Sequence, residues 1–194
     1  MVTYDERTAL VVVDVQNDFA DPNGSLYVQE GEKVVSVINE QVEQARSNRA
    51  TVVYTQDWHP PSTPHFQKDG GIWPVHCVQG TWGAELHPDL EVSGDVVKKG
   101  TGGEDGYSGF TVRDPESGEK QQTPLEEMLR AGGVEKVVIV GLATDYCVKE
   151  TAIDSVSKRF ATTVLTDGIR AVDLEPGDGE SAIEDMRKAG ATLG

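Results

Sequence analysis

The sequence is short of positive charge. Only 17 lysines and arginines stand against 33 aspartates and glutamates, so the formal net charge is −16 at pH 7. An acidic surface of this kind repels a phosphate backbone, and we therefore expect no nucleic-acid partner. No apolar run approaches the roughly 20 residues of a membrane-spanning helix, and we expect no membrane partner either. We interpret the acidity as an aid to solubility or to salt tolerance.

Cysteine is also scarce, with Cys77 and Cys147 alone. Two cysteines do not form a disulfide framework, and a reducing compartment would keep both as free thiols. The N-terminus lacks the basic and then apolar layout of a secretory signal. We therefore expect a cytoplasmic protein. The sequence leaves the number of subunits open, a homo-oligomer included.

Short apolar, β-rich runs alternate with helical patterns along the chain. Strands are predicted at 9–13, 51–55, 95–98, 136–140 and 162–166, and helices at about 31–47, 124–131, 178–189 and directly after Cys147. This order predicts an α/β fold with three αβα layers around a mostly parallel, doubly wound sheet. The chain length of 194 residues suits a single domain over 1–194. Residues 57–94 and 100–122 show little periodicity, and the three tryptophans in the first stretch indicate a functional loop and not disorder.

Ligands gather beyond the carboxyl ends of the strands in such folds, which directs attention to three residues. Asp14 ends the first strand, Lys99 follows the third, and Cys147 lies between a strand and a helix. A helix N-terminus favours the thiolate, and partial desolvation raises the pKa of a carboxyl group toward the range of a general base. Because side chains alternate along a strand, only one of Lys98 and Lys99 should reach the site. Each residue also has a purely structural alternative: a turn cap for Asp14, a solvated side chain for Lys99, and a buried, unreactive thiol for Cys147.

One cluster combines a carboxylate with three of the four histidines: Asp57, His59, His65 and His76. Asp57 and His59 are two residues apart, so an extended backbone projects both from one side. One carboxylate with two or three imidazoles is a common ligand set for a divalent metal ion, and it leaves zinc, iron and manganese open. The alternative is a group of surface histidines. We expect His87 to be structural and Cys77 to fill space.

Taken together, these segments resemble the nicotinamidase/pyrazinamidase family of isochorismatase-like cysteine hydrolases, over nearly the whole chain. The matching segments are 13–19, 57–59 with His65, 73–77, 99–100 with 107–110, and 141–148. The aspartate, lysine and cysteine are shared across the superfamily, whereas the histidines and segment 73–77 are typical of the nicotinamidase branch. The resemblance implies the isochorismatase-like fold. It also implies hydrolysis of nicotinamide, and of pyrazinamide, to the acid and ammonia through a cysteine thioester, in NAD salvage.

The resemblance also assigns roles to individual residues. It implies a catalytic triad of Asp14, Lys99 and Cys147, and an oxyanion hole of Ala143 and Cys147. It implies a cis peptide bond between Leu142 and Ala143. One divalent metal ion would be bound by Asp57, His59 and His76, with His65 as a further ligand. The pocket for a small aromatic amide would have walls formed by Phe19, Trp73 and Tyr107.

Three other functions remain open at this point. A related amidase acting on a carbamoyl or ureido substrate would keep Asp14, Lys99 and Cys147 but would not need the histidine cluster. An isochorismatase acts on a vinyl ether and would not need Cys147. In a non-catalytic metal-binding or partner-binding domain the triad would be a coincidence, and the convergence of three residue types from separate strand ends argues against that.

Overall fold

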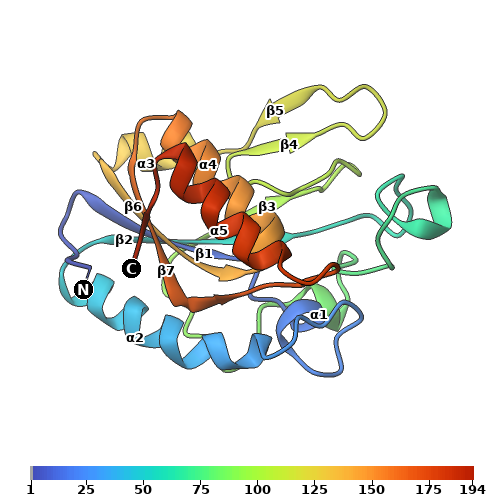
Figure 1. The fold of residues 1–194 in the computed structure, drawn as a ribbon, viewed down its shortest axis with the longest axis horizontal. Coiled ribbons are helices and arrows are strands. Elements are labelled where there is room, and N and C mark those ends of the chain that lie inside the picture. The colour runs from blue at the N-terminus through green and yellow to red at the C-terminus, as the bar shows by residue number, and fades with distance from the viewer. Residues whose placement is uncertain (1) are drawn as a thin grey trace.

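The fold is built around one parallel sheet. The computed structural model describes residues 2–194. Six strands pair in parallel in the order β3-β2-β1-β6-β7-β8 (Figure 1). Their bounds are Thr8–Val13 (β1), Thr51–Asp57 (β2), Asp95–Lys99 (β3), Lys136–Leu142 (β6), Ala161–Arg170 (β7) and Thr192–Leu193 (β8). The predicted parallel, doubly wound sheet is therefore confirmed.

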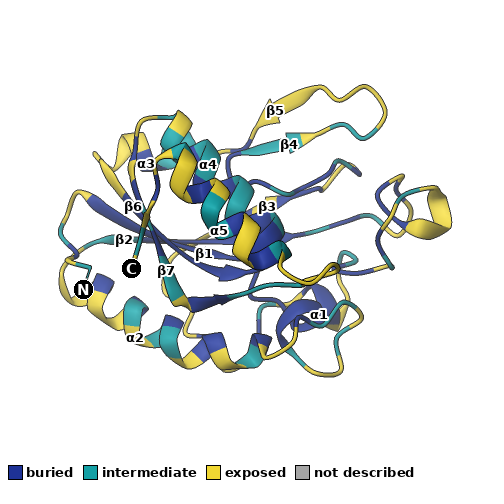
Figure 2. Ribbon diagram, in the orientation of Figure 1, coloured by how far each residue is buried: buried dark blue, intermediate teal, exposed yellow. Residues whose placement is uncertain are grey.

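Helices cover both faces of the sheet and make the predicted three layers (Figure 1). They are α1 (Asn17–Ala20), α2 (Val34–Ser47), α3 (Leu125–Ala131), α4 (Lys149–Ser157) and α5 (Asp178–Ala189). Alternate residues of β1 belong to different cores: Leu10 and Val12 pack with α2, whereas Val11 packs with α3, α4 and α5. Burial on both faces explains why β1 is apolar throughout, and Figure 2 shows the central strands as buried.

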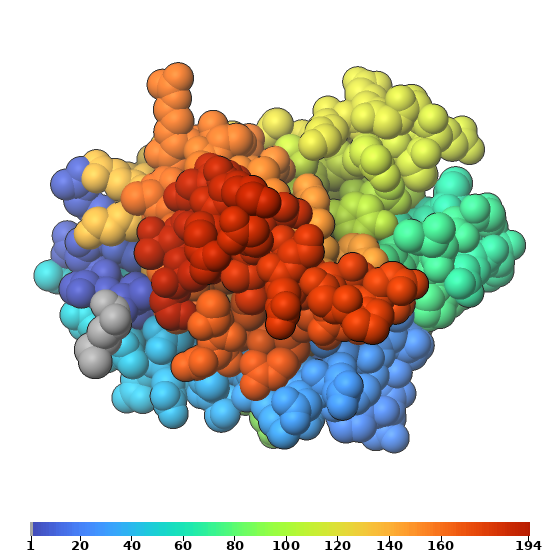
Figure 3. Space-filling view, viewed as in Figure 1, coloured from blue at the N-terminus to red at the C-terminus, as the bar shows by residue number. Residues whose placement is uncertain are grey.

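Several elements differ from the sequence prediction. The stretch 100–122 was predicted as loop but contains the antiparallel hairpin β4 (Thr111–Arg113) and β5 (Lys120–Gln122). Apart from Val112 its strand residues are polar, and most are exposed, so they carry no apolar alternation. The hairpin stands out from the body of the molecule in Figure 3. Strand β8 has two residues, too few to show a period. Residues 58–94 agree with the prediction of little regular structure, because they hold two short 3-10 turns, Gln67–Asp69 and Trp82–Ala84, and isolated β-bridges.

The sheet order fixes where a site can form. From β1 the chain proceeds to β2 and β3 on one side, and from β6 to β7 and β8 on the other. The boundary between β1 and β6 is a topological switch point, and ligands bind outside it at the carboxyl ends of the strands. Asp14 directly follows β1, Lys99 ends β3, and the turn Thr144–Val148 follows β6.

Within residues 2–194, no helix is both long enough and apolar enough to cross a membrane.

Candidate active site

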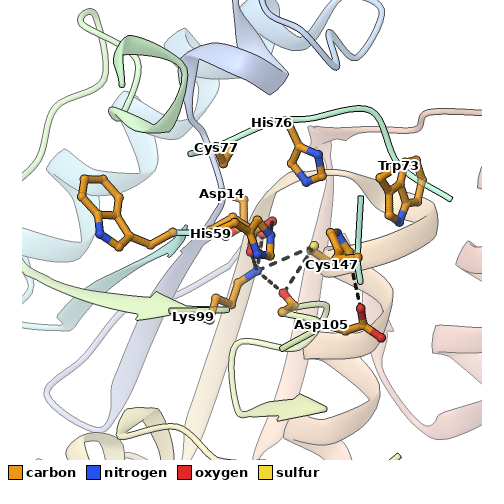
Figure 4. A network of polar contacts seen from close by, with 12 residues as sticks. Asp14, His59, Trp73, His76, Cys77, Lys99, Asp105 and Cys147 are labelled. Atoms are coloured by element: carbon orange, nitrogen blue, oxygen red, sulfur yellow. Dashed lines mark hydrogen bonds and ion pairs between the residues drawn. The ribbon is translucent and has the colours of Figure 1, made fainter. Parts of the chain in front are cut away.

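A fully buried lysine lies at the centre of the site (Figure 4). Lys99 Nζ donates to Asp14 Oδ2 at 2.7 Å, to Asp57 Oδ1 at 2.6 Å, and to the carbonyl oxygen of Gly106. Cys147 Sγ lies 3.8 Å from the same nitrogen. The structure thus brings together the aspartate, lysine and cysteine that the sequence selected from three strand ends.

The neighbouring strand residues take the positions that alternation predicts. Lys98 is exposed, and its Nζ lies 3.5 Å above the centre of the Trp58 ring, so it points away from Asp14. Thr55 donates from Oγ1 to Asp14 Oδ1 at 2.6 Å and was not predicted. Thr55 is two residues before Asp57 in β2 and therefore shares its face, a signal that the sequence contained.

The carboxylates of the site have opposite pKa shifts. Burial raises the pKa of Asp14 to about 6, with Asp57 adding to the rise and Lys99 opposing it. Burial would also raise the pKa of Asp57, but Lys99 and His59 hold it well below its usual range. Burial would lower the pKa of Lys99, whereas both carboxylates raise it well above its ordinary value. At neutral pH Lys99 is therefore a cation and Asp57 an anion, while Asp14 can exchange a proton.

The protonation of Cys147 is influenced mainly by burial. Burial raises the pKa of its thiol well above the ordinary value, Lys99 opposes the rise, and the carboxylates of Asp14 and Asp57 add to it. Cys147 lies in the π-helical turn Thr144–Val148, which leads directly into helix α4, so the expectation that a helix N-terminus favours its thiolate stays a prediction. The thiol needs a base to remove its proton.

Three buried histidines meet beside this triad. His59, His65 and His76 each offer a ring nitrogen within 4.8 Å of the others. His65 Nδ1 pairs with Asp105 Oδ1 at 2.7 Å, and His76 Nδ1 pairs with the carbonyl oxygen of Pro74 at 2.7 Å. A carboxylate and a carbonyl only accept hydrogen bonds, so Nδ1 is the donor in both rings and Nε2 is the nitrogen left for a ligand.

His59 supplies the test of whether this cluster fits a metal ion. Among residues 2–194, neither of its ring nitrogens has a hydrogen-bond partner, although the ring is completely buried. A buried nitrogen left unpaired costs about 1–3 kcal/mol, which coordination to a cation would offset. Asp57 Oδ2 lies 3.7 Å from His59 Nε2, while Asp57 Oδ1 accepts from Lys99. Asp57 thus connects the two clusters, and three imidazoles with one carboxylate suit a divalent metal ion.

A small, mainly apolar pocket opens over Cys147. It is lined by all three predicted aromatic residues, Phe19, Trp73 and Tyr107, and by His65 and His76. Trp73 Nε1 donates to Tyr107 Oη at 2.8 Å, and this bond fixes both rings. Further walls come from Leu26, Val28, Leu142, Tyr146 and Val172, which the sequence analysis missed. Most of these lie in irregular segments, where no hydrophobic period marks them.

The remaining sequence expectations concern backbone and structural positions. The peptide bond between Leu142 and Ala143 is cis. Ala143 and Cys147 line the same pocket. His87 accepts the N–H of Asp89 through Nδ1 at 3.3 Å, a structural contact, as predicted. Cys77 is completely buried and forms no part of the histidine cluster within residues 2–194.

Comparisons with known proteins show which family the chain resembles. The chain matches the isochorismatase domain model over residues 8–194. It is 37% identical to a nicotinamidase of Escherichia coli (strain K12), over 95% of this chain and 93% of that protein. It is 40% identical to a nicotinamidase/pyrazinamidase of Mycobacterium tuberculosis, over 95% and 97%. The crystal structure of a pyrazinamidase of Pyrococcus horikoshii in complex with zinc superposes with a TM-score of 0.86 at 38% identity, over 97% of this chain and 98% of that one.

The contact between Gly100 and His59 yields a prediction about metal binding. Gly100 has φ +72°, and a Cβ there would lie 2.6 Å from His59 Cε1. We expect Gly100→Ala to displace the His59 ring and weaken zinc binding by at least about tenfold, comparable with the loss of a supporting contact at other metal sites. Titration against a chromophoric chelator measures this affinity.

Gly118 provides the matched control. Its φ is +74°, but a Cβ there meets nothing within 4 Å. Both alanine variants should lose about 1–2 kcal/mol of unfolding free energy through backbone strain, and only Gly100→Ala should lose metal affinity. Equal metal affinities in the two variants would contradict the prediction.

The two cysteines should differ in reactivity. Both thiols are buried and their pKa values are raised, but only Cys147 lines the pocket and lies beside Asp14. We expect iodoacetamide to label Cys147 much faster than Cys77, because only Cys147 is reached from the pocket and the Lys99 cation beside it favours the thiolate. Peptide mass spectrometry over time separates the two sites. Comparable labelling rates for both cysteines would show that Cys147 is not activated.

Proposed function

Because the chain belongs to the isochorismatase domain family, we propose that it is a cysteine amidohydrolase that converts nicotinamide to nicotinate and ammonia. The observation that carries the proposal is the meeting of Cys147, Lys99 and Asp14 with a three-histidine cluster beside one small pocket, which Cys147, His65 and His76 line. The similarity to nicotinamidases and pyrazinamidases supports an aromatic amide as the substrate, with pyrazinamide as a second one.

In the first half of the reaction Asp14 acts as the base. Its carboxylate takes the proton of the Cys147 thiol, and the resulting thiolate attacks the carboxamide carbon. Lys99 stays protonated and stabilises the negative charge that passes between carboxylate and sulfur. The backbone N–H groups of Ala143 and Cys147 hold the oxyanion, and such a donor is worth about 3 kcal/mol in other enzymes. Asp14 then returns its proton to the amide nitrogen, which leaves as ammonia.

In the second half a water molecule replaces the ammonia. Asp14 takes a proton from this water as its oxygen adds to the thioester carbon. The same N–H groups hold the second oxyanion. The carbon–sulfur bond then breaks, and the proton on Asp14 returns to the Cys147 sulfur. The acid leaves and gives its own proton to solvent, where the product is nicotinate. The cycle therefore regenerates the neutral thiol that burial favours in the resting protein.

Asp57, His59, His65 and His76 would hold one divalent metal ion, which we propose to be zinc, iron or manganese. When bound there, the ion supplies a Lewis-acidic position for the ring nitrogen of the substrate, and so acts as a template. Phe19, Trp73 and Tyr107 enclose the ring and exclude water from the carbon under attack.

We also propose a cytoplasmic location. The reaction requires Cys147 as a free thiol, and both cysteines are free in this structure. Reducing compartments keep thiols in that state.

The proposed function is tested by the release of ammonia from nicotinamide. We expect turnover in the metal-loaded protein and its loss after treatment with a chelator. Cys147→Ala should lower kcat by at least about 10⁴-fold, as for the nucleophiles of other covalent enzymes, and should retain its metal. Cys77→Ala, which removes the other thiol, should keep most of the activity.

Two results would count against this function. Near-normal hydrolysis by Cys147→Ala would exclude the thioester. Faster release of ammonia from a ureido compound than from nicotinamide would point to the related class of amidase.

The raised pKa of Asp14 predicts an acid limb in the pH profile. Asp14 must be ionised to accept the thiol proton, and its pKa is raised to about 6. We expect kcat/KM to fall about tenfold per pH unit below that value and to level off above it. Thr55→Val removes a hydrogen bond that lowers the pKa of Asp14, so the fall should move to higher pH. A profile that stays flat well below pH 6 in both proteins would rule out this role for Asp14.

A further inference from the structure

The hairpin β4–β5 anchors a buried carboxylate outside the catalytic triad. Asp105 pairs with Arg113 of β4 through two backbone hydrogen bonds, Asp105 N–H to the Arg113 carbonyl at 2.8 Å and Arg113 N–H to the Asp105 carbonyl at 2.9 Å. The Arg113 guanidinium donates to Asp105 Oδ2 from Nη2 at 2.7 Å and from Nε at 3.3 Å. Four contacts from one residue therefore fix the backbone and one carboxylate oxygen of Asp105.

The other carboxylate oxygen of Asp105 reaches the histidine cluster. Asp105 Oδ1 accepts from His65 Nδ1 at 2.7 Å, and both side chains are buried. His76 Nδ1 instead donates to a neutral carbonyl oxygen, that of Pro74 two residues before it. Among residues 2–194, neither nitrogen of His59 has a hydrogen-bond partner. His65 is thus the cluster member that is hydrogen-bonded to a charged group, and that group comes from a distant part of the chain.

A carboxylate in this position has two effects on an imidazole. It keeps the proton on Nδ1, so that Nε2 presents its lone pair, and it increases the basicity of that lone pair. It also fixes the ring plane, because the carboxylate is itself held on the far side by Arg113. The sequence resemblance gave His65 as a further ligand, and because Asp105 engages Nδ1, Nε2 is the nitrogen left for the site that His59 and His76 share.

We propose that Asp105 is a positioning residue for the metal site, and that the hairpin β4–β5 sets metal affinity through the relay from Arg113 to Asp105 to His65. The proposal rests on the proposed function, in which this site binds the metal ion that holds the substrate. It gives the exposed hairpin a role in the chemistry. Carboxylate partners of metal-ligating histidines contribute about 10–100-fold to metal affinity elsewhere.

The affinity for zinc alone tests the proposal. We expect Asp105→Asn to bind zinc about 10–100-fold more weakly than the unmodified protein, in competition with a chromophoric chelator. Arg113→Ala removes a half-exposed side chain, so the fold should tolerate it, and it should weaken zinc binding by a smaller factor. Thermal unfolding of the metal-free proteins shows that each variant is folded.

Asp154→Asn is the matched control. Asp154 Oδ2 accepts from Ser108 Oγ at 2.6 Å and from Thr111 Oγ1 at 2.9 Å, so it anchors the same segment without touching a histidine. Its zinc affinity should stay close to that of the unmodified protein. Unchanged affinity in both Asp105→Asn and Arg113→Ala would overturn the proposal. So would an equal loss in Asp154→Asn, since general loosening of the segment would then explain it.

The outcome for Asp105 can be separated from the outcome for the proposed function. A protein that showed this pattern of zinc affinities but released no ammonia from nicotinamide would overturn the function and still support the relay. Ammonia release by the unmodified protein, together with unchanged zinc affinity in the relay variants, would support the function and overturn the relay.

Discussion

The site depends on one buried cation held between two carboxylates. A lysine ammonium taken out of water costs several kcal/mol unless charged groups compensate it, and Asp14 and Asp57 do so here. The sheet builds this arrangement, because β1, β2 and β3 are neighbours and Asp57 and Lys99 are register partners. Cys147 approaches from β6, on the other side of β1, so the order of four strands determines which charges surround the sulfur.

Asp57 makes the catalytic and histidine clusters parts of one system. One of its oxygens accepts from Lys99 and the other faces His59. A change in charge near the histidines therefore alters the electrostatic environment of the Lys99 ammonium through the Asp57 carboxylate. The neutral Cys147 thiol fits this system, since a resting thiolate would add a third negative group to a buried site that holds one cation.

The sequence predicted those parts of the site that residue type and strand position determine. Strand ends indicated Asp14, Lys99 and Cys147, and alternation distinguished Lys99 from Lys98. Irregular segments show no hydrophobic period from which their contacts could be predicted. The hydrogen bond from His65 to Asp105 and the pocket wall at Val172 therefore appeared only in the structure. The effect of burial on the Cys147 thiol was also missing from the sequence, because helix polarity can be deduced from a sequence but the depth of burial cannot.

The strand that carries the central cation lies at a border of the sheet. Strand β3 pairs with β2 alone, and its outer residues are exposed. Edge elements generally open with smaller free energies than the interior of a fold. Local separation of β3 from β2 would take Lys99 away from Asp14 and Asp57 while β1, β6 and their helices stay intact, and would end activity without global melting.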